Sequence, residues 1–281
     1  MNAVLKYPGA KNRIANWICE YIPKHDVYVE PYAGSLAVLF NKEPCHIETV
    51  NDLDDEIVNY FRVIRENGEE LRRLIGLTPY SRTEYKRAYE KADDDIERAR
   101  RFCVRCWMGV GNSSRYKNGF KNGQQKNSPN PAKAWSKLPE TIRMASERLK
   151  CVQIECLPAL ELIGRYDTGD VFMYIDPPYL HGTRKNYLYK YEMDDHEHEE
   201  LLKVLVRHQG KIALSGYESE MYNDYLFSWN KVTKDTRAES GLRRRETLWM
   251  NYDIQQGQMS MFGTDGKGDM DKLTLRWHRK G

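Results

Sequence analysis

The segment Asp170–Tyr179 places the strongest constraint on how this chain can fold. Its sequence, DVFMYIDPPY, is an apolar run of β-forming residues that ends at an acid, two prolines and a tyrosine. The run is typical of a buried strand, and the prolines end it because they lack the backbone donor that a strand ladder needs. We therefore expect Asp176 at the C-terminal edge of a strand, where open α/β sheets bind their ligands.

The four residues Asp176-Pro177-Pro178-Tyr179 fit one kind of chemistry, the methylation of an exocyclic amine on a base turned out of its stack. A carboxylate and a stiff backbone carbonyl can accept the two amino hydrogens, while the tyrosine ring stacks on the base. The alternative interpretation is a strand followed by a proline-rich turn without a catalytic role.

Strands and helices alternate on both sides of this segment. The patterns predict strands at Val27–Glu30, His46–Val50, Cys151–Ile154, Val171–Ile175, Lys211–Leu214 and Glu246–Tyr252, and helices at Ser35–Phe40, Asp54–Glu66, Ala159–Gly164 and Asp194–His208. Ser81–Gly111 and Ala132–Leu149 are also predicted to be helical, with a loop at Asn112–Pro131 between them. The alternation predicts an α/β fold whose mostly parallel sheet is covered on both faces.

The interruption of this alternation suggests the domain organisation. We expect a catalytic domain in two parts, residues 1–78 and 151–253, with a mainly helical insertion at 79–150 and a flexible tail at 254–281. A chain of 281 residues suits one domain with such an insertion. The tail is rich in glycine, glutamine, methionine and aspartate, a composition that favours disorder.

Three further motifs precede the strand that ends at Asp176. They are Lys6-Tyr7-Pro8-Gly9-Ala10-Lys11, then Tyr28-Val29-Glu30-Pro31-Tyr32-Ala33-Gly34-Ser35, then Asn51-Asp52 after a strand. In this order, with the DPPY motif downstream, the chain resembles the Dam-like (D12 class) DNA adenine-N6 methyltransferases, most closely the branch common in phages and prophages. The resemblance covers nearly the whole chain and implies a doubly wound, Rossmann-like methyltransferase fold whose insertion recognises DNA.

The resemblance implies that S-adenosylmethionine is the methyl donor and that no metal is required. It implies cofactor contacts at Tyr7, Lys11, Glu30, Gly34, Asp52 and Asp176, and catalysis at Asp176, Pro177, Pro178 and Tyr179. Asp52 is placed to accept hydrogen bonds from both ribose hydroxyls, as an acid does in dinucleotide folds. We expect direct transfer to adenine N6 without a covalent enzyme intermediate.

The chain departs from the family pattern at three places. Leu36 stands where the first turn usually has a third small residue, and Ala10 replaces the usual second glycine of the N-terminal motif. Cys156-Leu157 lies where related enzymes often have polar residues near the cofactor adenine.

The positive charges are concentrated in the predicted insertion. The net charge is only +3, but no acid occurs between Glu97 and Glu140. Ten basic residues lie there: Arg98, Arg100, Arg101, Arg105, Arg115, Lys117, Lys121, Lys126, Lys133 and Lys137. Ten uncompensated charges suit the phosphate backbone of double-stranded DNA, and we expect Arg115, Lys117 and Lys121 to bind it. A solvated basic face without a ligand is the alternative.

The segment Leu180–Tyr191, which follows the catalytic turn, has two interpretations. It contains Arg184, Lys185 and three tyrosines, so it could form a lid that grips the flipped strand, with Arg184 binding DNA. An ordinary exposed loop is the alternative.

The cysteines favour neither a disulfide framework nor a metal site. Six cysteines at irregular spacings in a chain of this length do not form a disulfide pattern. Cys103 and Cys106 form a CxxC pair, but both also fit the apolar stripe of one helix. No run of eighteen apolar residues and no signal pattern occur, so we expect a cytoplasmic protein that does not enter a membrane.

Two other functions compete with adenine methylation. One is methylation of cytosine N4 or of a protein glutamine amide, which the aspartate at the head of DPPY and the basic insertion disfavour. The other is a catalytically idle DNA-binding relative, against which the intact Asp176, Tyr179 and Asp52 argue.

The tail contains one further motif. Gln258, Met259, Met261 and Phe262 resemble the short peptide that binds the bacterial sliding clamp, with a leading glutamine and apolar anchors. An apolar segment that packs on its own domain is the alternative.

Overall fold

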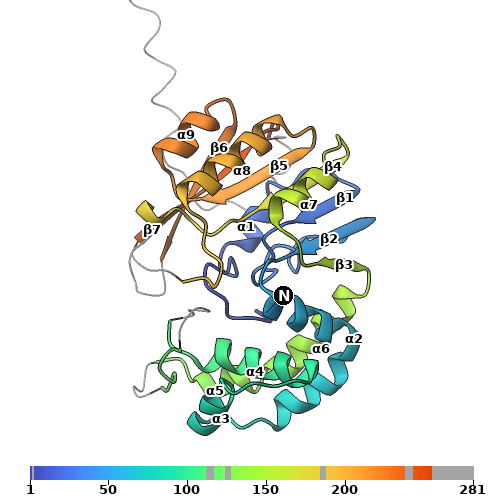
Figure 1. Ribbon diagram of the computed structural model, residues 1–281, viewed down its shortest axis with the longest axis vertical. Helices are drawn as coiled ribbons and strands as arrows, with labels where there is room; N and C mark the ends of the chain where they lie inside the picture. Colours follow the sequence, from blue (N-terminus) through green and yellow to red (C-terminus); the bar gives the residue numbers. More distant parts are fainter. Residues whose placement is uncertain (2, 112–116, 124–127, 184–187, 238–242, 255–281) are drawn as a thin grey trace, which may run out of the picture.

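The computed structural model describes residues 1, 3–111, 117–123, 128–183, 188–237 and 243–254. Figure 1 shows two lobes, a sheet with its helices above and a bundle of helices below. The long helix α2 (Asp55–Leu77) starts beside the sheet and runs into the lower lobe. One continuous apolar core joins the two lobes, because it contains Tyr28 and Phe172 of the sheet, Ile64 of α2 and Ala145 of the lower lobe.

The described residues form one seven-stranded sheet. Its strands are β1 (Val27–Glu30), β2 (Ile47–Asn51), β3 (Val152–Glu155), β4 (Val171–Ile175), β5 (Lys211–Gly216), β6 (Asn230–Arg237) and β7 (Arg243–Met250). Their order is β3-β2-β1-β4-β5-β7-β6, with β1 to β5 parallel to one another and β7 antiparallel to both of its neighbours. The predicted doubly wound, mostly parallel sheet is confirmed.

Strand β4 divides its side chains between the two faces of this sheet. Val171, Met173 and Ile175 pack in one apolar cluster with α7 (Ala159–Arg165), α8 (Asp195–Arg207) and α9 (Glu220–Tyr225). Phe172 and Tyr174 face the other cluster, which also contains α1 (Ala15–Cys19). The apolar residues of β4 are thus buried on both sides, as a continuous apolar strand requires.

The helical lobe occupies the predicted insertion and the second half of α2. It comprises α3 (Arg82–Arg87), α4 (Asp95–Met108), α5 (Pro131–Trp135) and α6 (Leu138–Leu149). Helix α2 packs against both α4 and α6. The exact division into domains stays a prediction.

Several predicted elements were wrong or missed. Ser35–Phe40 forms turns instead of a helix, because Leu36 has a positive φ of 55° that no α-helix accepts. Ser81–Gly111 is broken between Arg87 and Asp95, where Asp94 caps the new helix. The short helices α1 and α9 and the strand β6 were not predicted.

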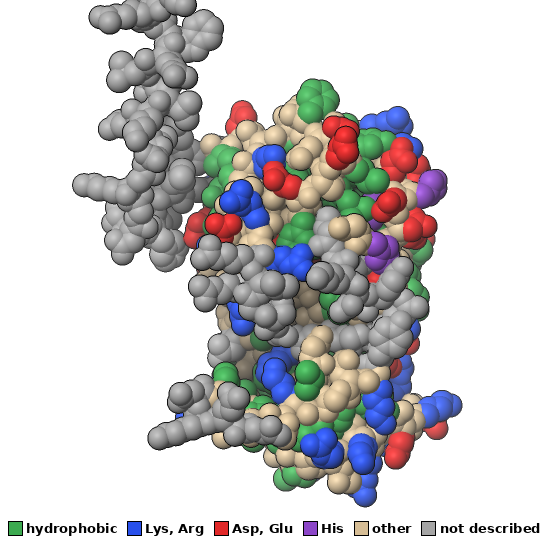
Figure 2. All heavy atoms as spheres, turned by 90° about the vertical axis from the view of Figure 1, so that its left-hand side faces the viewer, with side chains coloured by type: hydrophobic (Ala, Val, Ile, Leu, Met, Phe, Trp, Pro, Cys, Tyr) green, Lys and Arg blue, Asp and Glu red, His purple; other side chains and the backbone are tan. Residues whose placement is uncertain are grey.

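Lysine and arginine side chains are spread over the helical lobe, on the face that Figure 2 presents. The view shows few acidic side chains there, whereas the sheet lobe above carries both signs of charge. This distribution agrees with the position of the basic segment in the sequence.

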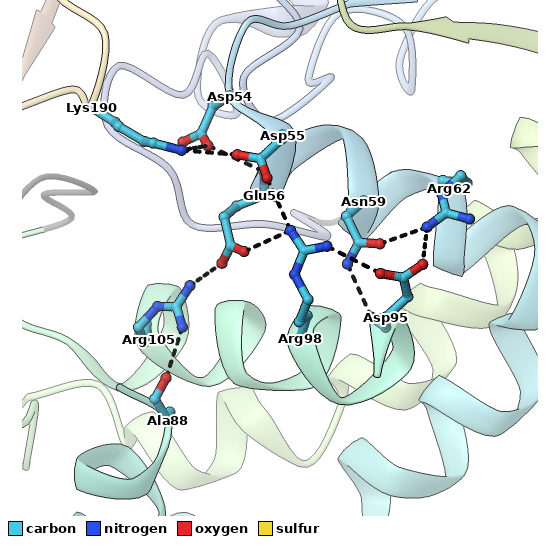
Figure 3. A network of polar contacts seen from close by, with 10 residues as sticks. All are labelled: Asp54, Asp55, Glu56, Asn59, Arg62, Ala88, Asp95, Arg98, Arg105 and Lys190. Carbon is cyan, nitrogen blue, oxygen red and sulfur yellow. Dashed lines mark hydrogen bonds and ion pairs between the residues drawn. The ribbon is translucent and has the colours of Figure 1, made fainter. Parts of the chain in front are cut away.

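The prediction of ten uncompensated charges was nevertheless wrong for four arginines of α4. Arg98 pairs with Asp55 at 3.0 Å, and Arg105 pairs with Glu56 (Figure 3). Arg100 and Arg101 both pair with Glu97. The acids of α2 lie far upstream in the sequence, so a count along α4 alone cannot find them. Arg98 and Arg105 hold α4 against α2.

None of the helices in the described ranges is both long and apolar enough to cross a membrane. The acids and arginines distributed along α2, the longest of them, illustrate why.

Asn51, at the end of β2, ties together three segments that carry the site. Its amide donates to Pro31 O at 2.9 Å and Leu157 O at 3.0 Å, and its Oδ1 accepts from Leu157 N at 2.8 Å. The turns after β1 and β3 are therefore fastened to the end of β2.

We predict that Asn51→Ala lowers the free energy of unfolding by about 2–4 kcal/mol, because it leaves buried backbone groups without partners. Urea unfolding followed by circular dichroism measures this change. Asn16→Ala, on an exposed position of α1, is the control and should lie within about 0.5 kcal/mol of wild type. A loss below about 0.5 kcal/mol for Asn51→Ala would show that the hydrogen bonds of Asn51 do not stabilise these turns.

Candidate active site

A cavity of about 390 Å³ opens at the carboxyl ends of β1, β2 and β4. The winding of the sheet changes direction between β1 and β4, because β2 and β3 lie on one side and β5 on the other. Ligands of doubly wound folds bind at such a switch point. All six predicted cofactor residues line this one cavity: Tyr7, Lys11, Glu30, Gly34, Asp52 and Asp176.

Asp52 is held by the backbone of two neighbouring turns. Its Oδ2 accepts from Gly34 N at 2.9 Å, and its Oδ1 accepts from Asp54 N at 2.9 Å. Gly34 has a φ of 47°, which a glycine adopts without strain. Each carboxylate oxygen keeps a second lone pair for a ligand. Burial raises the pKa of Asp52 to about 6, although hydrogen bonds from the backbone of Asp54, Gly34 and Leu53 oppose the shift.

Glu30, the last residue of β1, is almost fully buried at 2% exposure. The Tyr28 hydroxyl donates to its Oε2 at 2.8 Å. Burial raises the pKa of Glu30 to about 8, and the hydrogen bond from Tyr28 offsets part of that shift. A cationic ligand group beside Glu30 would favour its ionised form.

Asp176 is oriented by Lys11 and Ser215. Lys11 Nζ lies 2.9 Å from Asp176 Oδ1, and the Ser215 hydroxyl donates to the same oxygen at 2.8 Å. Ser215 is at the end of β5, and the Tyr174 hydroxyl lies 2.9 Å from its Oγ. Burial lowers the pKa of Lys11, but the negative charges of Asp176 and Glu246 outweigh burial and raise it overall. Lys11 is therefore a fixed cation beside Asp176.

Tyr179 is held on three sides. Its hydroxyl donates to Glu246 of β7, and Lys11 Nζ lies 4.7 Å above the centre of its ring. The Tyr217 ring meets it edge-on, with centroids 4.6 Å apart. Tyr179 and Pro177 are not among the residues that line the cavity, whereas Asp176 and Pro178 are.

The described residues Leu188–Met193 form a strap beside the cavity. Tyr189, Tyr191, Glu192 and Met193 line the cavity. Lys190 fastens the strap to the start of α2, 3.1 Å from Asp54 Oδ1 and 2.9 Å from Asp55 Oδ1 (Figure 3). A Cβ atom on Gly9 would collide with the Tyr189 hydroxyl, so the strap lies directly on the N-terminal motif.

Only two of the four predicted DNA-binding residues fall in the described part of the chain. Lys117 and Lys121 follow α4 in the helical lobe, where an isolated bridge joins Gly109 to Phe120. Lys117 Nζ lies 5.0 Å above the Tyr89 ring. Arg115 and Arg184 lie outside the described residues, as do Gln258, Met259, Met261 and Phe262.

No group of three or more potential metal ligands occurs among the residues that the structure describes. Cys103 of the CxxC pair is fully buried in α4 and accepts a hydrogen bond from the Tyr60 hydroxyl at 3.5 Å. The core interpretation of Cys103 is therefore correct.

The model of the D12 class N6 adenine-specific DNA methyltransferase family matches residues 7–240. The chain belongs to this family. The enzyme is thus an adenine-specific DNA methyltransferase, and methyltransferases of this family use S-adenosylmethionine. Adenine is accordingly the target that the family supports, ahead of cytosine N4 or a protein amide.

Curated relatives of the methyltransferase cover most of its length. It is 26% identical to the type II methyltransferase M.MjaIII of Methanocaldococcus jannaschii, over 88% of this chain and 98% of the relative. It is also 26% identical to the type II methyltransferase M1.LlaDCHI of Lactococcus lactis subsp. cremoris, over 88% and 94%. The retron Ec67 DNA adenine methylase of Escherichia coli is 28% identical over 66% of each chain. Membership of the phage and prophage branch stays a prediction.

One solved structure, a precorrin-8w decarboxylase of Methanobacterium thermoautotrophicum, matches with a TM-score of 0.37 and 11% identity, over 88% of this chain and 92% of the other. The fold assignment depends on the strand order and not on this likeness.

The cavity of the methyltransferase fits a donor of this kind. Its volume lies within the usual range of about 300–1,000 Å³ for small-molecule sites. Asp52 and Glu30 offer acceptors for hydroxyl and ammonium groups, and Lys11 offers a cation. Gly9 and Gly34, both with positive φ, keep the backbone close to the cavity.

Three polar residues of the methyltransferase site were not predicted: Ser215, Glu246 and Lys190. The residue types of Ser215 and Glu246 alone assign no role to them. The predicted strand Glu246–Tyr252 already placed Glu246 on a strand, but only the folded sheet shows what it contacts.

Proposed function

We propose that the methyltransferase transfers the methyl group directly to N6 of an adenine that has been turned out of the duplex, at the Asp176–Tyr179 motif. The observation that carries this proposal is the convergence of Asp176 with all predicted cofactor residues on one cavity. When bound there, S-adenosylmethionine supplies a methyl group on a positively charged sulfur.

The adenine amine is a weak nucleophile, because its lone pair is delocalised into the ring. Hydrogen bonds from the amine to the Asp176 carboxylate and the Pro177 carbonyl favour a more tetrahedral nitrogen. They also aim its lone pair toward the cavity. Alignment of the two reacting atoms contributes much of the remaining rate enhancement.

The Tyr179 ring is the proposed stacking surface for the flipped base, a contact worth about 1–3 kcal/mol. Lys11 Nζ already lies over one face of this ring. The base is therefore expected on the opposite face, with Pro178 stiffening the backbone between the carboxylate and the ring.

For the donor, we assign the ribose hydroxyls to Asp52 and the amino acid end to Lys11 and Glu30, with Tyr7 and Gly34 as further contacts. This assignment matches the donor's carboxylate with the Lys11 ammonium and its ammonium with the Glu30 carboxylate.

For DNA, we assign phosphate contacts to Arg115, Lys117, Lys121 and Arg184. The insertion at 79–150 would then act as the target-recognition domain. The α4 arginines that pair with acids of α2, α3 and α4 itself are left out of this assignment, because their charge is already compensated.

The interpretation of Gln258, Met259, Met261 and Phe262 as a sliding-clamp motif stays a prediction. A localisation in the cytoplasm also stays a prediction.

We predict that Asp176→Asn lowers the single-turnover rate of methyl transfer by at least about 100-fold, the order expected for losing one positioned hydrogen-bond partner at a reacting centre. DNA affinity should stay within roughly threefold, since Asp176 faces the amine and not phosphate. The assay uses labelled donor, followed by nucleoside mass spectrometry for N6-methyladenine. Asp224→Asn, exposed on α9, is the control. Full activity in Asp176→Asn would refute the assignment.

We predict that affinity for the demethylated product, S-adenosylhomocysteine, rises as the pH increases through about 6, because ionised Asp52 is the better acceptor. Asp52→Asn should remove this step and weaken binding by about 1.5–3 kcal/mol at pH 7.5. Calorimetry between pH 5 and pH 7.5 measures both effects, below the pKa of about 8 at Glu30. Asp170→Asn, at the opposite end of β4, should behave as wild type. If the affinity of Asp52→Asn for S-adenosylhomocysteine still rose through pH 6, the ionisation of Asp52 would be excluded as the cause.

Replacing Arg115, Lys117 and Lys121 together by glutamine should weaken DNA binding and reduce the slope of log affinity against log salt. Each lost phosphate contact reduces the slope by roughly 0.9 for duplex DNA. Fluorescence anisotropy at several salt concentrations gives the slope. Lys24→Gln with Lys211→Gln, both in the sheet lobe, is the control. A slope equal to that of wild type would show that these residues do not contact phosphate.

A further inference from the structure

Glu246 is a buried carboxylate to which the proposed reaction assigns no role. It lies on β7 and is only 5% exposed. Charged side chains are rarely buried to this degree unless they are paired. In the described structure its side chain contacts Tyr179 and Lys11, which are two residues of the proposed site.

The topology explains how β7 reaches the site. Strand β7 runs antiparallel to β5, with Thr247 opposite Gly216 at the end of β5. Glu246 therefore lies just beyond the carboxyl end of β5, at the sheet edge where β4 delivers Asp176. The antiparallel strand β7 thus brings a carboxylate to the edge formed by the carboxyl ends of the parallel strands.

Two carboxylates share one ammonium at this edge. Lys11 Nζ is 2.9 Å from Asp176 Oδ1 and 3.4 Å from Glu246 Oε1. Burial raises the pKa of Glu246, the charge of Lys11 and the Tyr179 hydrogen bond lower it, and the nearby Asp176 charge raises it further. Lys11 Nζ is thus paired with both carboxylates at once.

The contacts of Asp176 are asymmetric. Among the described residues, Lys11 and Ser215 both contact Oδ1. This leaves Oδ2 as the oxygen for a ligand. The orientation of the carboxylate therefore depends on where Lys11 Nζ lies, and Glu246 is one of the groups that fix that position.

We propose that Glu246 is a positioning residue for methyl transfer: it holds the Tyr179 ring through its hydroxyl and the Lys11 ammonium through its charge, so that Asp176 presents Oδ2 to the target amine. The inference rests on the proposed function at the Asp176–Tyr179 motif. A single buried side chain then sets both the stacking surface and the hydrogen-bond acceptor for the base.

The test compares four proteins: Glu246→Gln, Tyr179→Phe, the double variant, and Asp235→Asn as the matched control. Asp235 is an acid on the neighbouring strand β6 that pairs with Arg245 on the surface, so its loss should change nothing. Glu246→Gln keeps the volume and removes the charge, and Tyr179→Phe keeps the ring and removes the hydroxyl. Thermal unfolding of each variant checks that it is folded.

We expect Glu246→Gln to lower the single-turnover methylation rate by at least tenfold, with product affinity and DNA affinity within about threefold of wild type. Tyr179→Phe should also lower the rate. Because both variants break the same contact, the double variant should lose less than the product of the two single effects. A structural role alone would instead lower stability and all affinities together.

Three outcomes would overturn the inference: a wild-type rate in folded Glu246→Gln, a loss confined to donor or DNA affinity, or single effects that multiply in the double variant. Should Glu246→Gln fail to fold, an unchanged rate in Tyr179→Phe would overturn it instead. Failure of the proposed function itself is distinguishable, because Asp176→Asn would then methylate DNA at the wild-type rate.

Discussion

The adjacency of β1 and β4 is the constraint on which the site depends. The chain winds from β1 toward β3 on one side and from β4 toward β5 on the other, so the carboxyl ends of β1 and β4 meet with no crossover between them. Glu30 ends one of these strands and Asp176 follows the other. The N-terminal motif, with Lys11, lies across the same gap. Residues from distant parts of the sequence are therefore brought to one cavity by topology alone.

The positions of residues that directly follow a strand could be predicted from the sequence. The proline pair marks where β4 ends, and Asn51-Asp52 marks the end of β2, so Asp176 and Asp52 were assigned correctly to the same sheet edge. The predictions failed where the partner of a side chain lies far away in the sequence. Arg98 and Arg105 of α4 looked uncompensated because their partners Asp55 and Glu56 precede them by about forty residues or more. Glu246 was missed because only the antiparallel pairing of β7 brings it to the site.

The turn after β1 contains backbone strain at Leu36 that the sequence did not predict. Leu36 adopts a φ of 55°, an unfavourable conformation for a residue with a Cβ atom, and its side chain is fully buried. The family usually has a small residue here, which would adopt this φ more easily. In this chain the buried side chain offsets the strain with apolar contacts, and the turn keeps the shape that presents Gly34 N to Asp52. The prediction of a helix over Ser35–Phe40 failed because helix propensity takes no account of this turn.

The first turn of α2 links the cofactor cavity to the helical lobe. Asp52 lies immediately before it and contacts the Gly34 turn, while Asp54 and Asp55 bind Lys190 of the strap. On the other side, Asp55 and Glu56 bind arginines of α4 (Figure 3). Asp55 therefore pairs with Lys190 of the strap and with Arg98 of the helical lobe at the same time. Because these groups share one short stretch of backbone, neither the strap nor α4 can move far from α2 without breaking an ion pair. The positions of the strap and of α4 are thus both fixed by Asp54, Asp55 and Glu56 at the start of α2.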